Sequence, residues 1–218
     1  MEPVTIPWSP TDPDGVRGFE VPGERAWIGP PPGAAAGGPE PEGPFILPLA
    51  RREAVHDVHD LIEELWSRLL FRLWTCGPER FPAWEAGTVL EALWSLARRD
   101  EMPPEIAGCS LRYLEEGRVW KRPVRDFGDA VFEILRDGGR RGRGVGAERA
   151  EDLTKVYLRG LAGDAPASQV HAFQLDPGFS CWFPRAGRAA AWAIAGASES
   201  WLALFLAADE ESEEGAPE

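Results

Sequence analysis

Residues 189–208 form a nearly continuous apolar stretch, interrupted only by the polar triplet Ser198-Glu199-Ser200. This stretch constrains the fold strongly. Within residues 201–207 both alternating sets of side chains are apolar, and in a strand these sets lie on opposite faces. A strand that is apolar on both faces belongs inside a sheet that is covered on both sides. We therefore predict two strands, 189–197 and 201–207, joined by a turn at the polar triplet.

The same stretch also has the length of a membrane-spanning helix, and Arg185 and Arg188 precede it. However, Glu199 falls near its middle, where a charged side chain costs roughly 2.5–3.5 kcal/mol in a bilayer. The stretch is also rich in Ala and Gly. The two-strand interpretation explains the residues better, and we expect no membrane association.

The segment that begins near Arg51 has the spacing of a long amphipathic helix. Apolar residues recur every three or four positions from Val55 to Leu73, which places them on one stripe of a helix. Gly77 and Pro78 then interrupt the pattern, because neither residue favours continuation of a helix. We predict a single helix up to this point.

Three shorter helices are predicted further along the chain, over about 83–99, 126–137 and 147–161. Asp126 is a candidate N-cap, because its carboxylate can accept a hydrogen bond from a backbone N–H of the first turn. Gly138 and Gly163 follow the last two helices, at the position where glycine commonly ends a helix.

Further strands are predicted over 110–115, 118–124, 169–175 and 179–183, with Glu116-Gly117 as a hairpin turn between the first two. Helices followed by a cluster of strands favour the α+β class. We predict about four helices packed on a mostly antiparallel C-terminal sheet.

The chain divides by composition into four parts. Residues 1–28 are predicted to form an N-terminal arm with one or two edge strands, and 29–44 a Pro/Gly-rich linker or loop. Residues 45–208 are predicted to form one globular domain, and 209–218 a disordered acidic tail. The formal net charge is −13, and most of it falls in the arm and the tail. The predicted domain is therefore close to neutral.

The cysteines and the N-terminal residues indicate the cellular compartment in which the protein is expected. The three cysteines, Cys76, Cys109 and Cys181, are widely spaced and form no CxxC pair. Neither a disulfide framework nor a zinc ribbon is expected, which favours a reducing environment. The first residues show no secretory signal. We therefore expect a soluble cytoplasmic protein.

Two histidines near the start of the first predicted helix form the candidate metal site. His56, His59 and Glu63 are spaced by three and four residues, which places them on one face of a helix. Imidazole and carboxylate groups so arranged can share a transition metal ion. The alternative is that these residues form an ordinary solvent-exposed first turn of the helix. Acidic side chains in such a turn interact favourably with the helix dipole. No organic cofactor is expected.

Residues 138–146 read Gly-Gly-Arg-Arg-Gly-Arg-Gly-Val-Gly and form a glycine-rich cationic loop before a predicted helix. Such a loop can hold an anion with backbone N–H groups, although the Walker A and dinucleotide motifs are both absent. Six basic residues could form one patch for a nucleic acid or phosphate ligand: Arg140, Arg141, Arg143, Arg118, Lys121 and Arg122. Asn is absent and Lys occurs twice against 21 Arg, which indicates a GC-rich genome and weakens any argument from Arg content.

Nine of the ten tryptophans divide into two sets. Those at periodic apolar positions are predicted to be core: Trp66, Trp94, Trp120, Trp192 and Trp201. Those in predicted loops or at helix ends are candidates for exposed interface anchors: Trp8, Trp27, Trp74 and Trp84.

The interpretation favoured by these observations is a non-catalytic protein-binding or regulatory protein. An immunity or inhibitor protein, or an accessory subunit of a defence or secretion system, is its concrete form, with another protein as the partner. An acidic chain suits a basic partner through electrostatic steering. A metal-dependent enzyme using His56, His59 and Glu63 and a nucleic-acid or phosphate binder using residues 138–146 stay open as alternatives.

Overall fold

The computed structural model describes residues 17–21, 24–28, 41–76, 84–98, 118–177, 183, 186–197 and 201–210. Its main feature is a six-stranded antiparallel sheet in the order β3-β4-β8-β7-β6-β5. In that order the strands are Pro41–Pro44, Arg68–Cys76, Trp201–Glu210, Ala186–Gly196, Val170–Leu175 and Val119–Arg122. The predicted α+β class is confirmed.

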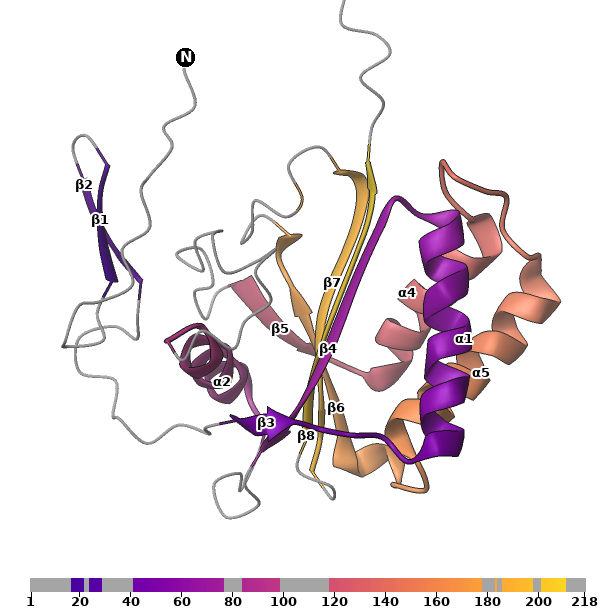
Figure 1. Cartoon of the computed structure of the whole chain (residues 1–218), viewed down its shortest axis with the longest axis horizontal. Coiled ribbons are helices and arrows are strands. Elements are labelled where there is room, and N and C mark those ends of the chain that lie inside the picture. Colours follow the sequence, from indigo (N-terminus) through magenta and orange to yellow (C-terminus); the bar gives the residue numbers. More distant parts are fainter. Residues whose placement is uncertain are drawn as a thin grey trace, which may run out of the picture.

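Helices cover both faces of this sheet (Figure 1). On one face lie α1 (Leu49–Leu65), α4 (Val124–Asp137) and α5 (Ala147–Ala162), which form one core with the sheet. On the other face lies α2 (Ala86–Arg98), which forms a second core. No helix within the described residues is long and apolar enough to cross a lipid bilayer.

Strand β8 lies in the middle of the sheet, between β4 and β7. Its Leu202, Leu204 and Leu206 belong to the core beside α2. Its Ala203, Phe205 and Ala207 belong to the core under the other three helices. All six side chains are fully buried, which confirms the prediction from the two apolar faces of this segment.

The long helix predicted up to Gly77 is wrong in its second half. Helix α1 ends at Leu65, Trp66 has extended backbone angles, and residues 68–76 form strand β4. Strand β4 pairs with β8 from Arg68↔Ala208 to Thr75↔Trp201. Its residues are apolar on both faces, so their spacing fits a helical stripe as well as a buried strand. Pairing with the central strand decides between the two.

The other three helices agree with their predictions within a few residues. Gly138 and Gly163 end α4 and α5 with φ angles of 66° and 60°, in the left-handed region that favours glycine. Asp126 is not the N-cap. It lies in the first turn of α4, and Pro123 occupies the cap position without a side-chain hydrogen bond. A carboxylate in the first turn still interacts favourably with the helix dipole.

The strand predictions hold for β6, β7 and β8. Strand β5 is shorter than the predicted 118–124, because Val124 already begins α4. It pairs with β6, in the register Val119↔Leu175 to Arg122↔Ala172. The predicted strand 110–115 and the turn at Glu116-Gly117 lie outside the described residues, and so does nearly all of 179–183.

The segments on either side of the predicted domain 45–208 differ in part from their predicted structure. Strands β1 (Arg17–Val21) and β2 (Glu24–Ile28) pair with each other as a separate two-stranded sheet. Strand β3 lies inside the predicted linker 29–44, and β8 extends to Glu210, inside the predicted tail 209–218. The first two residues of that tail therefore belong to the sheet.

Candidate functional site

The predicted metal ligand His59 lies in the interior, where α1 packs against α5. Its Nε2 atom is 2.8 Å from the hydroxyl oxygen of Tyr157, and its ring lies 4.4 Å from the ring of Phe71. Burial, together with the smaller effect of the nearby His56, lowers the pKa of His59 from 6.5 to about 3. His59 is therefore a neutral core residue that joins two helices and a strand.

The other two predicted ligands are on the surface. His56 and Glu63 are exposed, and the ring centroids of His56 and His59 are 6.3 Å apart. Among the described residues, no group of three or more His, Cys, Asp or Glu side chains is arranged to hold a metal ion. The Nε2 atom of His59 is already engaged by the Tyr157 hydroxyl.

Close packing accounts for two of the glycines in the 138–146 loop. A Cβ atom on Gly139 would lie 2.6 Å from Cδ1 of Trp66 and 2.7 Å from the carbonyl oxygen of Leu65. A Cβ atom on Gly144 would overlap the carbonyl group of Arg136. These positions need glycine so that the loop can pack against the end of α1 and fold back on α4.

Several backbone N–H groups of this loop donate hydrogen bonds within the protein. The N–H of Arg140 donates to both carboxylate oxygens of Asp209, at 3.1 and 3.2 Å. The N–H of Arg141 donates to the carbonyl of Leu65 at 3.2 Å, and that of Gly139 to the carbonyl of Gly142 at 3.0 Å. A phosphate cradle needs such groups to point at the ligand, and these three N–H groups are directed at protein oxygens instead.

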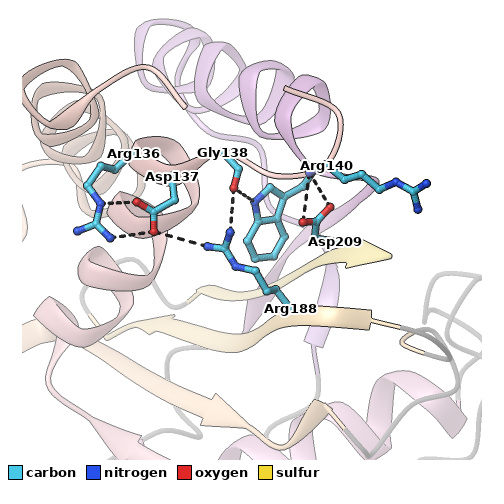
Figure 2. A network of polar contacts seen from close by, with 7 residues as sticks. Arg136, Asp137, Gly138, Arg140, Arg188 and Asp209 are labelled. Carbon is cyan, nitrogen blue, oxygen red and sulfur yellow. Dashed lines mark hydrogen bonds and ion pairs between the residues drawn. The ribbon is translucent and has the colours of Figure 1, made fainter. Parts of the chain in front are cut away.

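A network of polar contacts fixes the start of the loop (Figure 2). The carbonyl of Gly138 accepts hydrogen bonds from Nε1 of Trp66 at 3.2 Å and from the guanidinium of Arg188 at 3.0 Å. The same guanidinium lies 5.2 Å from the Trp66 ring centre and 3.8 Å from the Asp137 carboxylate. The loop, α1 and strand β7 are therefore connected at this carbonyl.

The arginine side chains of the loop are exposed: Arg140, Arg141 and Arg143. In Figure 2 the side chain of Arg140 points away from the network that holds its backbone. The loop thus carries three cationic groups on a backbone that is hydrogen-bonded to α1 and β8.

The other three predicted cations lie at strand β5, at the edge of the sheet, and each has a partner. Arg118 forms an ion pair with Asp176 at 2.9 Å. Lys121 contacts the Glu85 carboxylate and the carbonyl of Trp84, both at 2.7 Å. Arg122 donates to the side chain of Gln174 at 3.1 Å. Lys121 and Arg122 precede α4 and the loop follows it, and this helix is about 21 Å long, so the six cations do not form one patch.

Sequence reasoning did not identify the acidic face of α1, which we define as Ile46, Leu49, Glu53, Asp57, Asp60, Glu63 and Glu64. All seven side chains are exposed, and Ile46 and Leu49 are 74% and 62% exposed. From Leu49 onward, steps of three or four residues place the charged members on the side of the helix opposite its buried stripe. None of the five carboxylates forms an ion pair with another described residue.

Of the seven tryptophans whose side chains the structure describes, five are buried. Three that were predicted to be core are buried: Trp66, Trp192 and Trp201. Trp120 is not, because β5 is an edge strand of the sheet and leaves this side chain 40% exposed. Trp74 and Trp84 were candidate exposed anchors, yet both are buried beside α2. Both residues pack into this core, although each lies close to residues 77–83, which the structure does not describe.

The comparisons with known proteins identify no relative. No protein-family model matches the sequence, and no significant match occurs among curated proteins or solved structures. The geometry of the chain itself therefore carries the functional argument.

Proposed function

We propose that this chain is a protein-binding regulatory protein that engages a basic partner through the acidic face of α1. An immunity or inhibitor protein, or an accessory subunit of a defence or secretion system, is the concrete form of this proposal. The observation that carries the proposal is the combination of five carboxylates and the exposed Leu49 on one face of α1 with the exposed Ile46, which lies just before the helix.

The carboxylates are spaced in a way that is unfavourable for an isolated helix. Glu53 and Asp57 are four residues apart, and so are Asp60 and Glu64. Like charges at this spacing destabilise a helix by roughly 0.2–0.5 kcal/mol per pair. A basic partner would convert this repulsion into attraction and would accelerate association by electrostatic steering.

The two apolar residues of the acidic face add a hydrophobic contribution to binding, which the charged residues alone do not provide. Ile46 and Leu49 lie at the start of the acidic stripe, and burial of a large aliphatic side chain contributes about 1.5–3 kcal/mol. Charged groups around an apolar contact then fix its orientation and its partner specificity. This arrangement supports a protein partner over a small ion.

The experiment is affinity capture with matched variants, followed by reconstitution with the purified partner. We expect the wild-type chain to bind a basic protein, with affinity that falls as salt rises. Leu49→Ser and the double variant Asp57→Asn/Asp60→Asn should each weaken binding at least about tenfold, or roughly 1.4 kcal/mol. The matched control Asp129→Asn/Glu133→Gln removes two exposed carboxylates from α4 and should bind like the wild type.

Equal binding by the wild type and both α1 variants would overturn the proposal. The metal-dependent alternative predicts a different result, namely stoichiometric transition metal in the purified chain that is lost on His59→Ala. The nucleic-acid alternative predicts salt-dependent oligonucleotide binding that is lost when Arg140, Arg141 and Arg143 become Ala. Three exposed arginines on an anchored loop are the observation that keeps this last alternative in view.

A further inference from the structure

Strand β5 is the last strand of the six-stranded sheet, and among the described strands it has a neighbour, β6, on one side only (Figure 1). In an antiparallel pair, every second residue directs its backbone N–H and C=O at the partner strand, and the residues between direct theirs away. The N–H of Asp176 donates to the carbonyl of Arg118 at 3.1 Å, so Trp120 also directs its backbone groups at β6. The backbone groups of Val119 and Lys121 therefore point outward from the edge of the sheet.

The same edge carries a large exposed ring. The side chain of Trp120 is 40% exposed, whereas that of its neighbour Val119 is buried beside α2. Because side chains alternate along a strand, Trp120 lies on the opposite face of the sheet, where α1, α4 and α5 pack. Exposed tryptophans are favoured anchors of protein interfaces. The edge thus offers both backbone groups and an aromatic side chain to another strand.

The charged side chains at this edge are matched inside the molecule. Each of the three cations has an anionic or amide partner: Asp176 for Arg118, Glu85 for Lys121 and Gln174 for Arg122. Charged side chains on an edge strand discourage pairing, and these internal partners reduce that effect. The whole chain carries a net charge of −13, so two copies repel each other least where the local charges are balanced. The edge of β5 therefore suits a second copy of the chain better than a strongly charged partner.

One symmetric register uses all the outward backbone groups of two such strands. When Val119 of each copy lies opposite Lys121 of the other, both pairs exchange backbone hydrogen bonds around a twofold axis. A register centred on Lys121 would set Val119 against Pro123, which has no N–H. A register centred on Val119 would place Lys121 beyond the first residue of the other strand. The register centred on Trp120 is therefore the favoured one.

This register sets Trp120 directly opposite its own copy. The two residues form a pair without backbone hydrogen bonds, in which the Cα atoms are about 4.5 Å apart and the side chains are closest. Aromatic side chains paired in this way across two strands stabilise the pairing.

We propose that the chain forms a symmetric dimer through β5, with the two sheets joined edge to edge and the two Trp120 rings in contact across the twofold axis. The same surface of both copies makes such an interface. It is small, because one short strand and one ring contribute from each side, so the dimer is weak and forms at high protein concentration. It does not use the acidic face of α1, so the proposed function neither requires nor excludes it.

Sedimentation velocity over a range of protein concentrations tests the dimer. We expect the wild type to associate, and Trp120→Ser to weaken the association at least about tenfold, as for an anchor residue at the centre of an interface. Near-ultraviolet circular dichroism checks that the variant keeps the fold. A wild-type chain that stays monomeric up to about 1 mM would overturn the proposal, and so would a dimer that Trp120→Ser leaves unchanged.

A charge reversal tests the register. Across the twofold axis, Arg122 of one copy lies opposite Arg118 of the other, at two symmetric positions. Arg122→Glu replaces these like charges by opposite charges, so it should strengthen the dimer about fivefold. The matched control Arg125→Glu makes the same change in net charge at a side chain that is 82% exposed on α4, and it should not strengthen the dimer. Equal effects of the two reversals would rule out this register.

Cysteine cross-linking provides a second measure of the register. In Trp120→Cys the two introduced thiols face each other, so mild oxidation should link the two copies. In Arg122→Cys they are four residues apart along the strands, or about 13 Å, and should not link. Mass spectrometry of the linked peptides distinguishes these bonds from those of the natural cysteines. Equal linking at both positions would contradict the pairing of Trp120 with its own copy.

Discussion

The Nε2 atom of His59 lies 2.8 Å from the hydroxyl of Tyr157, and this contact joins α1 to α5 inside the core. Both side chains are buried, and Tyr157 packs against the rings of Phe127 and Phe205. The pair is therefore a single polar contact in an aromatic layer between the helices and the sheet. Burial also raises the pKa of the Tyr157 phenol, so both partners are neutral near pH 7.

Removal of the Tyr157 hydroxyl leaves the His59 nitrogen buried without this partner. We expect Tyr157→Phe to lower the free energy of unfolding by about 1–3 kcal/mol, the usual cost of an unsatisfied buried polar group. Urea-induced unfolding measures the change. In the double variant His59→Leu/Tyr157→Phe no polar group is left unpaired, so its loss should be smaller than the sum of the two single losses. Strict additivity would show that the two groups do not interact.

The buried histidine also predicts a pH dependence. The pKa of His59 in the folded chain is about 3, below its ordinary value of 6.5. Between these values the unfolded chain binds a proton that the folded chain does not. The stability from neutral His59 is thus fully present above pH 6.5 and is lost as the pH falls toward 3. Between pH 7.5 and 5.5 we expect a loss of about 1.4 kcal/mol.

The control for this prediction is His59→Leu, measured by urea unfolding at the same pH values. His171 has a lowered pKa as well, because of burial and the nearby Lys121, but it contributes equally to both chains. The difference in slope between wild type and variant therefore isolates His59. Identical slopes would contradict the assignment of a buried neutral imidazole.

Two glycine substitutions distinguish the effect of close packing on stability from the effect of helix propensity. Gly144→Ala places a Cβ atom on the carbonyl of Arg136, so we expect a loss of about 1–3 kcal/mol or more, as for overpacked cores. Gly87→Ala, in α2, meets nothing within 4 Å and should stabilise the chain by about 0.5–1 kcal/mol. Thermal unfolding of both variants measures the difference. A neutral Gly144→Ala variant would show that the loop does not hold the described geometry.

The position of Arg188 predicts a difference between arginine and lysine. Arg188→Met removes the hydrogen bond to Gly138 and the contact with the Trp66 ring, which we expect to cost about 1 kcal/mol at this half-exposed site. Arg188→Lys keeps the charge but not the planar, multidentate group, so part of the loss should persist. Chemical denaturation compares both with Arg125→Met, an exposed change expected to fall within about 0.5 kcal/mol.

Local signals in the sequence were enough for part of the fold. Gly138 and Gly163 end their helices because the left-handed backbone angle is a property of one residue. Strand β8 was also predictable, since two apolar faces leave only an interior position in a sheet. Strand β4 was not, because its residues fit both periodicities and its pairing partner lies at the other end of the chain.

The candidate sites were harder to predict for the same reason. His59 looked like a surface ligand because the partner that buries it, Tyr157, is 98 positions away in sequence. The loop glycines looked like a phosphate motif because Leu65 and Asp209, which accept N–H groups of the loop, also lie far from it in the chain. The acidic face of α1 did have a local signal in the spacing from Leu49 to Glu64, but the packing of α5 determines which side of α1 faces solvent.

The central place of β8 has a consequence for how the protein is made. Ribosomes release the N-terminal end first, yet the strand that joins β4 to β7 is the last element of the described chain. Until residues 201–210 emerge, β4 and β7 lack their common neighbour, and the apolar surfaces that β8 covers stay unpaired. The sheet can therefore close only after residues 201–210 have left the ribosome. A chain that is truncated before residue 201 lacks the strand with which β4 and β7 both pair, and it leaves the edges of these two strands open to other partners.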